Sequence, residues 1–216
     1  MFGEMRSLLG IPKSVDIMRH VNSLPPAERQ DALAGIREIE TRAMRNQQPQ
    51  PGLSELMAYL AAKGIPKAIC TRNCLEPVTH LMETFLHNVV FDPIVARDSG
   101  HEMEGRELRP KPSADGVLYI AGTWGVGTDG DTVVGVVDVA DAPKRRATAQ
   151  DIIMVGDGGN DMEAGRRAGA ATILLVNDVN RRFADHEHTD LVIDRLDELI
   201  QILEHGFEGR NIDFML

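Results

Sequence analysis

Apolar residues in the first 46 positions recur every three or four residues, the spacing of helices that pack one face against a core. Ser23, which is followed by two prolines and Glu28, is typical of a helix start within this region. The polar run 47–52 contains two prolines and a glycine, residues that interrupt regular structure. We therefore expect a small helical domain over residues 1–50, joined by this linker to a second domain. The apolar positions that carry the pattern are Met5, Leu8, Leu9, Val15, Met18, Val21, Leu33, Ile36, Ile39 and Met44.

Beyond the linker, short apolar runs alternate with amphipathic segments. The runs predict strands over 67–70, 89–95, 151–155, 171–176 and 191–193. The amphipathic segments predict helices over 53–63, 77–86, 113–124, 161–168 and 196–205. Such alternation is typical of a parallel sheet with helices on both faces. We therefore predict an α/β core of the three-layer, Rossmann-like type over residues 51–208, followed by a tail over 209–216.

Residues 125–150 break this alternation, because the segment is rich in glycine, aspartate and valine and then becomes basic. A connection of about 26 residues is long beside the usual ~2–6 residues between elements of a compact α/β domain. We expect a disordered insertion here, with a functional loop and an unremoved intron as the alternatives. A shorter segment of unexpected length, residues 99–108, is interpreted in the same way.

Composition and charge exclude several classes of protein. The 216 residues are 43% hydrophobic and carry a net charge of −10, so the chain has no basic excess to neutralise the phosphates of a nucleic acid. No apolar run approaches the ~20 residues that cross a bilayer. The first twenty residues mix charged and apolar side chains, unlike a secretory signal. We expect a cytoplasmic protein without nucleic-acid or membrane partners, whose two cysteines, Cys70 and Cys74, are reduced thiols.

One motif combines an apolar strand with two carboxylates. The strand 152–155 leads into Gly156, Asp157, two further glycines and, after one more residue, Asp161 at a helix start. Open α/β folds bind ligands at this carboxyl edge of the sheet. Carboxylate oxygens suit a hard cation such as Mg²⁺. We therefore predict a magnesium site at Asp157 and Asp161; the alternative is that Asp161 caps the helix and Asp157 closes a turn.

Two further motifs present groups that bind anions. The strand 67–70 ends at Thr71, followed by the donor residues Arg72 and Asn73, and a hydroxyl with nearby N–H groups can hold a phosphoryl oxygen. Lys111 stands between two prolines just before a helix, where a fixed ammonium can neutralise a transferring phosphoryl group. The alternatives are that Thr71 caps the next helix and that Arg72 and Lys111 are simply solvated.

The order of these motifs resembles the haloacid dehalogenase superfamily. The resemblance covers residues 51 to about 205 and implies a Mg²⁺-dependent phosphatase of a small phosphorylated molecule. Thr71 is then the phosphate-holding hydroxyl, with Arg72 and Asn73 beside it, and Lys111 is the charge-stabilising lysine. Asp157 and Asp161 belong to the magnesium site. The helical residues 1–46 look like the cap that many members carry.

The resemblance also implies a strand that this sequence lacks. Members of the superfamily begin with a strand ending in Asp-x-Asp, in which the first Asp attacks phosphorus and the second is the general acid and base. No such pattern lies on a predicted strand before residue 50. We therefore expect the central first strand to be missing and the chain to be an N-terminally shortened phosphatase. Asp138 and Asp141 have the wrong spacing to replace the pair, and 133–139 is the only spare run of β-forming residues for the vacant strand position.

Loss of a nucleophile costs roughly 10⁴–10⁶-fold in turnover, so we expect activity near background. With fewer carboxylates, Mg²⁺ should be held weakly or not at all. Two alternatives stay open: a non-catalytic module that binds a phosphorylated ligand through Thr71 and Lys111, and a truncated product of low stability. The dehalogenase branch of the superfamily is a more distant alternative. Neither the substrate nor the oligomeric state follows from the sequence.

Overall fold

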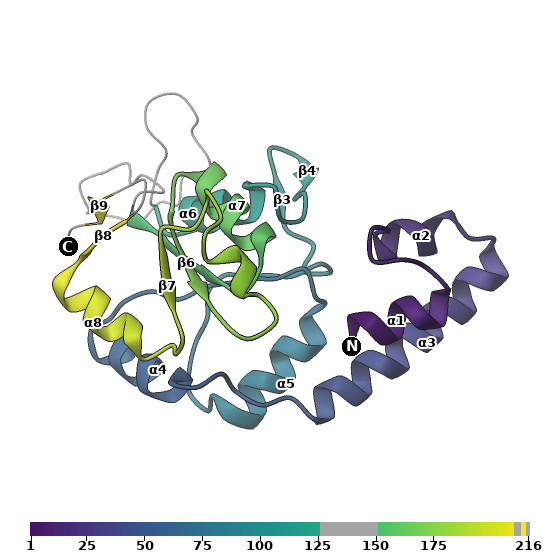
Figure 1. Cartoon of the computed structure of the whole chain (residues 1–216), viewed down its shortest axis with the longest axis horizontal. Coiled ribbons are helices and arrows are strands. Elements are labelled where there is room, and N and C mark those ends of the chain that lie inside the picture. Colours follow the sequence, from purple (N-terminus) through teal and green to yellow (C-terminus); the bar gives the residue numbers. More distant parts are fainter. Residues whose placement is uncertain (126–150, 210–212, 215–216) are drawn as a thin grey trace. The chain divides into compact units, whose positions relative to one another are not determined.

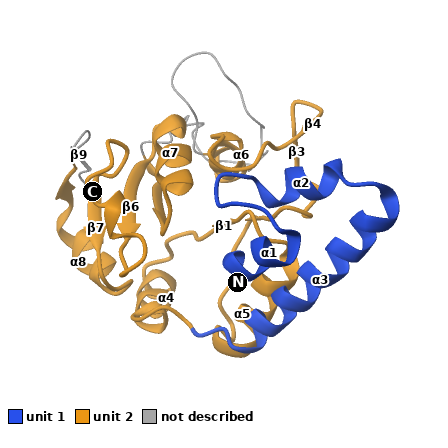
Figure 2. Ribbon diagram, turned by 45° about the vertical axis from the view of Figure 1, so that its right-hand side comes forward, with its two compact units in different colours: residues 1–48 blue, residues 49–216 orange. Residues whose placement is uncertain are grey.

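The computed structural model describes residues 1–125 and 151–209, with the backbone of 213–214. Within it the chain divides into two compact units, residues 1–48 and residues 49–216 (Figure 2). Each unit has a hydrophobic core of its own. The insertion expected after Gly125 lies outside the described residues.

Unit 1 consists of the helices α1 Phe2–Leu9, α2 Ile17–Ser23 and α3 Pro26–Arg45. Helix α1 ends at Gly10, whose left-handed conformation (φ 64°) costs a glycine little. The Asp16 carboxylate accepts the N–H of Arg19 at 2.9 Å and caps α2, and α3 has Pro26 at its first position. Apolar side chains at helical spacing form the core of the unit: Met5, Ile17, Val21, Ala32, Ile36 and Ile39.

Unit 2 alternates helices and strands (Figure 1). Its helices are α4 Leu53–Ala62, α5 Leu75–Phe85, α6 Asp115–Thr123, α7 Gly159–Ala168 and α8 Glu198–His205, with a 3-10 turn, η2, at Arg181–Phe183. Its strands are β1 Ile69–Cys70, β2 Ile94–Val95, β3 Glu102–Met103, β4 Arg106–Glu107, β5 Ile153–Gly156, β6 Ala171–Leu175, β7 Leu191–Ile193, β8 Phe207–Glu208 and β9 Asp213–Phe214. Each of these five helices lies within two residues of its predicted bounds. None of the helices in the described residues is both long and apolar enough to span a bilayer.

The strands form two parallel ladders and two hairpins. Strand β1 pairs with β2, and β5, β6 and β7 pair in that order, all in parallel. Strands β3 and β4 form one antiparallel hairpin, and β8 pairs antiparallel with β9. Among the described residues, no ladder joins β1–β2 to β5–β6–β7. The α/β fold with parallel sheets is confirmed, with the expected single sheet divided into two.

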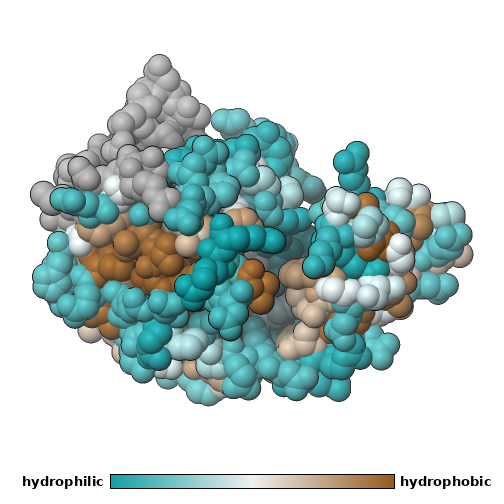
Figure 3. All heavy atoms as spheres, in the orientation of Figure 1, coloured by the Kyte–Doolittle hydropathy of each residue, from teal (hydrophilic) through white to brown (hydrophobic). Residues whose placement is uncertain are grey.

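Helices cover both faces of the β5–β7 sheet, which makes three layers (Figure 1). Successive side chains of a strand point to opposite faces, so Ile173 and Leu175 of β6 pack with α4 and α8, while Leu174 packs with Met162 of α7. Strand β6 is buried along its whole length. The helices do not cover the apolar side chains of unit 2 completely, since Figure 3 shows a continuous apolar area on its surface. Some side chains that pack against the core of α4, α8 and β6 are only partly buried, Val155 among them.

Two local expectations were wrong. Residues 89–93 are not a strand, because Asn88 takes a left-handed conformation (φ 67°) and Pro93 has no N–H for a ladder. Residues 99–108, expected to be disordered, contain the hairpin β3–β4. Strand β9 falls within residues 209–216, and the expectation of a tail there stays a prediction.

Candidate functional site

Lys111 connects the ends of the two parallel ladders. Its ammonium donates to the carbonyl of Cys70, the last residue of β1, at 2.5 Å. The same nitrogen lies 2.6 Å from Oδ1 of Asp161, in the first turn of α7 just after β5. The Lys111 side chain is 11% exposed and that of Asp161 13%, so this ion pair is largely shielded from water. The strand-end threonine, the lysine and the aspartate loop, predicted to meet at one edge, therefore lie together.

Thr71 continues the β1 ladder and then turns the chain. Its N–H donates to the Val95 carbonyl at 2.8 Å, and its hydroxyl accepts the N–H of Asn73 at 3.1 Å. The Asn73 carbonyl in turn accepts the N–H of Arg97 at 2.9 Å. Arg72 is exposed at the tip of the turn and makes contacts of its own. The hydroxyl thus organises the turn, and it lies one residue from the carbonyl that holds Lys111.

The two aspartates of the glycine-rich motif have different surroundings. Asp161 is nearly buried, and its Oδ2 accepts the N–H of Gly158 at 2.9 Å, as a helix-capping carboxylate does. The approach requires glycine at position 156, because a Cβ there would lie 2.3 Å from Cβ of Asp161. Asp157 is exposed at the end of β5. The capping alternative for Asp161 therefore describes what the residue does in the structure, and Asp157 is the more accessible carboxylate for a cation.

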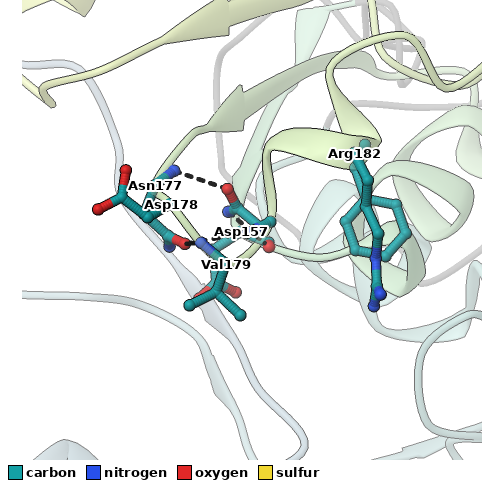
Figure 4. Close-up of a pocket in the computed structure, with 7 residues that line it drawn as sticks. Asp157, Asn177, Asp178, Val179 and Arg182 are labelled. Carbon is teal, nitrogen blue, oxygen red and sulfur yellow. Dashed lines mark hydrogen bonds between the residues drawn. The ribbon is translucent and has the colours of Figure 1, made fainter.

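A second contact set fixes the backbone at Asp157. The Asn180 amide donates to the carbonyls of Asp157 at 2.9 Å and Leu175 at 2.8 Å, while its oxygen accepts the N–H of Asn177. Asp157 and residues of the turn 177–183, Asp178 and Arg182 among them, line a cavity of about 480 Å³ (Figure 4). Thr71 and Lys111 are not among the residues that line it. Sequence reasoning missed Asn180, since an asparagine in a polar turn carries no distinguishing pattern.

Asp115, also missed from the sequence, anchors the segment that carries Lys111. Both of its oxygens accept hydrogen bonds, and its donors are Arg106, Arg109 and Ser113. These contacts, with the Arg109 guanidinium first, hold the pKa of this carboxyl far below its usual range. The sequence signal was two arginines upstream of an acidic residue at a helix start, which equally fits an ordinary helix cap.

The Cys70 thiol lies at the same junction. Burial raises the pKa of this thiol, and the nearby Lys111 ammonium offsets only part of the effect. Both cysteines are free thiols. A thiol with a raised pKa is a poor nucleophile at neutral pH, so Cys70 is not a candidate for nucleophilic chemistry at the junction.

The donor set suits a weakly held Mg²⁺ rather than a metal caged by protein. Mg²⁺ commonly takes one or two carboxylates and completes its shell with waters and substrate phosphate. Asp157 offers an exposed carboxylate, whereas both oxygens of Asp161 already accept hydrogen bonds. In the described part of the chain, no group of three or more potential metal-ligating side chains occurs. These residues fit a cation that depends on a ligand phosphate for part of its coordination.

Comparison with known proteins identifies the family. Residues 3–169 match the haloacid dehalogenase-like hydrolases, so the chain belongs to that family. An uncharacterized hydrolase of Saccharomyces cerevisiae is 36% identical over 209 residues, covering 94% of this chain and 82% of that protein. A haloacid dehalogenase-like hydrolase domain-containing protein of Arabidopsis thaliana is 28% identical over 205 residues, covering 91% and 70%.

Solved structures share the fold. CbbY from Rhodobacter sphaeroides, crystallised in complex with phosphate, has a TM-score of 0.61 at 21% identity, covering 92% of this chain and 86% of that one. A structure from Thermotoga maritima, assigned as a beta-phosphoglucomutase, has a TM-score of 0.57 at 16% identity, covering 94% of this chain and 89% of that one. Family membership and fold are thereby established. N-terminal shortening and loss of activity stay predictions.

Proposed function

We propose that this junction binds the phosphoryl group of a small phosphomonoester together with Mg²⁺, as in a phosphatase that works through an aspartyl-phosphate. We further propose that hydrolysis by the 216 residues themselves is close to background. The observation that carries the first proposal is the Lys111 ammonium, held between the Cys70 carbonyl and the Asp161 carboxylate. Such a fixed cation at a strand edge is suited to an oxyanion.

The contacts that the Lys111 ammonium makes within the described part of the chain leave one of its donors for a ligand oxygen. An ammonium has three donors, and in the described residues two of them meet Cys70 and Asp161. The third is available to a phosphoryl oxygen without loss of either partner. Thr71 would supply a hydroxyl to the same group, with Arg72 and Asn73 in the adjoining turn.

Asp157 would hold Mg²⁺, with Asp161 behind it fixing the lysine. When bound, the ion supplies positive charge that neutralises the phosphoryl oxygens. Related folds support a small phosphorylated ligand: CbbY binds phosphate, and a mutant of it was crystallised with xylulose-(1,5)bisphosphate. Low turnover is proposed because no Asp-x-Asp pair precedes the strand that ends at Thr71, where the family resemblance places the nucleophile.

Isothermal titration with inorganic phosphate and Mg²⁺ tests the binding proposal. We expect millimolar affinity that is lost in Lys111→Met and weakened in Asp157→Asn, with Lys63→Met as the control for a lysine of which 55% of the side chain is exposed. Absence of heat at millimolar phosphate would refute phosphoryl binding. Hydrolysis of p-nitrophenyl phosphate tests the second proposal, and turnover far above buffer that disappears in Lys111→Met would show that a nucleophile is present.

A further inference from the structure

Asp115 is distinguished by the number of contacts that its buried carboxylate makes. Its side chain is 3% exposed. Oδ2 accepts from Arg106 Nη1 at 2.6 Å and from the N–H and Nε of Arg109, both at 3.0 Å. Oδ1 accepts from Arg109 Nη2 at 2.9 Å and from the Ser113 hydroxyl at 2.8 Å. A buried carboxylate with this many donors, two of them guanidinium groups, is strongly held in place.

The donors to Asp115 lie on both sides of Lys111 along the chain. Arg109 stands two residues before Lys111 and Ser113 two residues after it, so one carboxylate holds the Arg109 backbone N–H on one side of the lysine and the Ser113 hydroxyl on the other. The Pro112 carbonyl also accepts a hydrogen bond from Arg167 of α7 at 3.1 Å. The backbone of Lys111 therefore has little freedom, although its side chain makes no direct contact with Asp115.

We infer that Asp115 is the positioning residue for Lys111: by fixing the segment 109–113 from both ends, it directs the lysine ammonium to the point between the Cys70 carbonyl and Asp161. Asp115 touches neither the ammonium nor the proposed ligand. The inference deepens the proposed phosphoryl site and rests on it for its consequence in binding, but the placement of the lysine can be measured without any ligand.

Selective acetylation of lysines, read by mass spectrometry on the intact fold, measures that placement. Lys111 should react slowly in the native protein, because its side chain is 11% exposed and ion-paired, whereas Lys63, at 55%, serves as the internal reference. In Asp115→Ala we expect the rate at Lys111 to rise about 10-fold relative to Lys63, because an ammonium displaced from its ion pair with Asp161 loses its shielding, and a change of about 1.4 kcal/mol is tenfold. Asp115→Asn should give an intermediate increase, because it keeps the shape and loses the charge.

The matched control is Asp197→Ala. Asp197 also pairs with an arginine, accepting from Nε and Nη2 of Arg195 at 3.0 Å each, but it lies at the start of α8 and away from Lys111. This variant should leave the Lys111 rate unchanged. If Asp115→Ala fails to fold, Asp115→Asn and Arg109→Gln give the same comparison.

Equal rates at Lys111 in the native protein and in every folded variant of the cluster would overturn the inference. A rise shared by Lys63 would do the same, because it would report general loosening. Phosphate titration of the variants then separates the two proposals. Loss of phosphate affinity in step with the rise at Lys111 supports both, whereas a native protein that binds no phosphate refutes the proposed function and leaves the acetylation result to decide the role of Asp115.

Discussion

Replacing Lys111 by methionine tests whether one ammonium holds the two parallel ladders together. Breaking a buried ion pair by removing one partner costs roughly 3–5 kcal/mol, against about 0–1 kcal/mol for an exposed pair. The side chains of Lys111 and Asp161 are 11% and 13% exposed, which places the pair near the buried limit. Asp161 would keep the N–H of Gly158 and the N-terminal end of α7, which offsets part of the loss. We therefore expect Lys111→Met to lower the free energy of unfolding by about 2–3 kcal/mol.

A double-mutant cycle separates the ion pair from other effects of the substitution. Urea unfolding of Lys111→Met, Asp161→Asn and the double variant gives their coupling energy, which we expect to exceed about 1.5 kcal/mol. The matched control pairs Lys63 with Glu204, whose side chains are 55% and 40% exposed and 3.9 Å apart; it should couple by less than about 1 kcal/mol. A coupling energy for Lys111 and Asp161 as small as that of the control would refute the reasoning.

Three further substitutions have expected results. The stability advantage of the native protein over Asp115→Asn should be full above about pH 5 and should shrink as the pH falls through the usual carboxyl range near 3.9, because the folded-state pKa of Asp115 is depressed; urea unfolding at pH 7, 5 and 3 measures it. Gly165→Ala should cost about 1–3 kcal/mol in thermal unfolding, since a Cβ would lie 2.7 Å from Cγ2 of Thr172. Arg166→Met should cost roughly 3–5 kcal/mol in the same assay, because it removes the guanidinium that pairs with the fully buried Asp190 carboxylate.

Each of these expectations has a result that contradicts it. A stability difference for Asp115→Asn that stays constant from pH 7 to pH 3 would mean that the carboxylate titrates normally. Unchanged thermal stability of Gly165→Ala would mean that α7 can move away from the sheet. Arg167→Met is the control for Arg166→Met, because the Arg167 side chain is 53% exposed and the loss of its exposed ion pair should change stability by less than about 1 kcal/mol.

The predicted elements agree with the structure where buried side chains recur at the spacing of a helix or a strand. The strand at 191–193 and the helices of unit 2 were predicted closely, since each of them contributes apolar side chains to one of the cores of that unit. The prediction failed where backbone chemistry overrides the pattern. Residues 89–93 are apolar enough for a strand, but Asn88 and Pro93 remove the conformation and the donor that a ladder needs.

The sequence predicts the separate motifs of the candidate site but not the contacts between their residues. The strand-end threonine, the lysine between prolines and the aspartate loop each follow from local motifs, and parallel topology brings such motifs to one edge. Asp115 and Asn180 were not predictable, because their importance lies in contacts with residues that the sequence does not mark. Asp161 illustrates the limit: the motif admits both metal binding and helix capping, and only coordinates show that Gly158 and Lys111 engage its two oxygens.

Two N–H groups of the Lys111 ammonium donate to fixed acceptors, so the third N–H points in one defined direction. A lysine at the end of a free chain can follow an oxyanion as it shifts, whereas this one can meet it along a single line of approach. Recognition at such a nitrogen depends on where the oxygen lies rather than on charge alone. We therefore expect anions of equal charge but different shape, such as sulfate and a dicarboxylate, to be distinguished by geometry before any other side chain takes part.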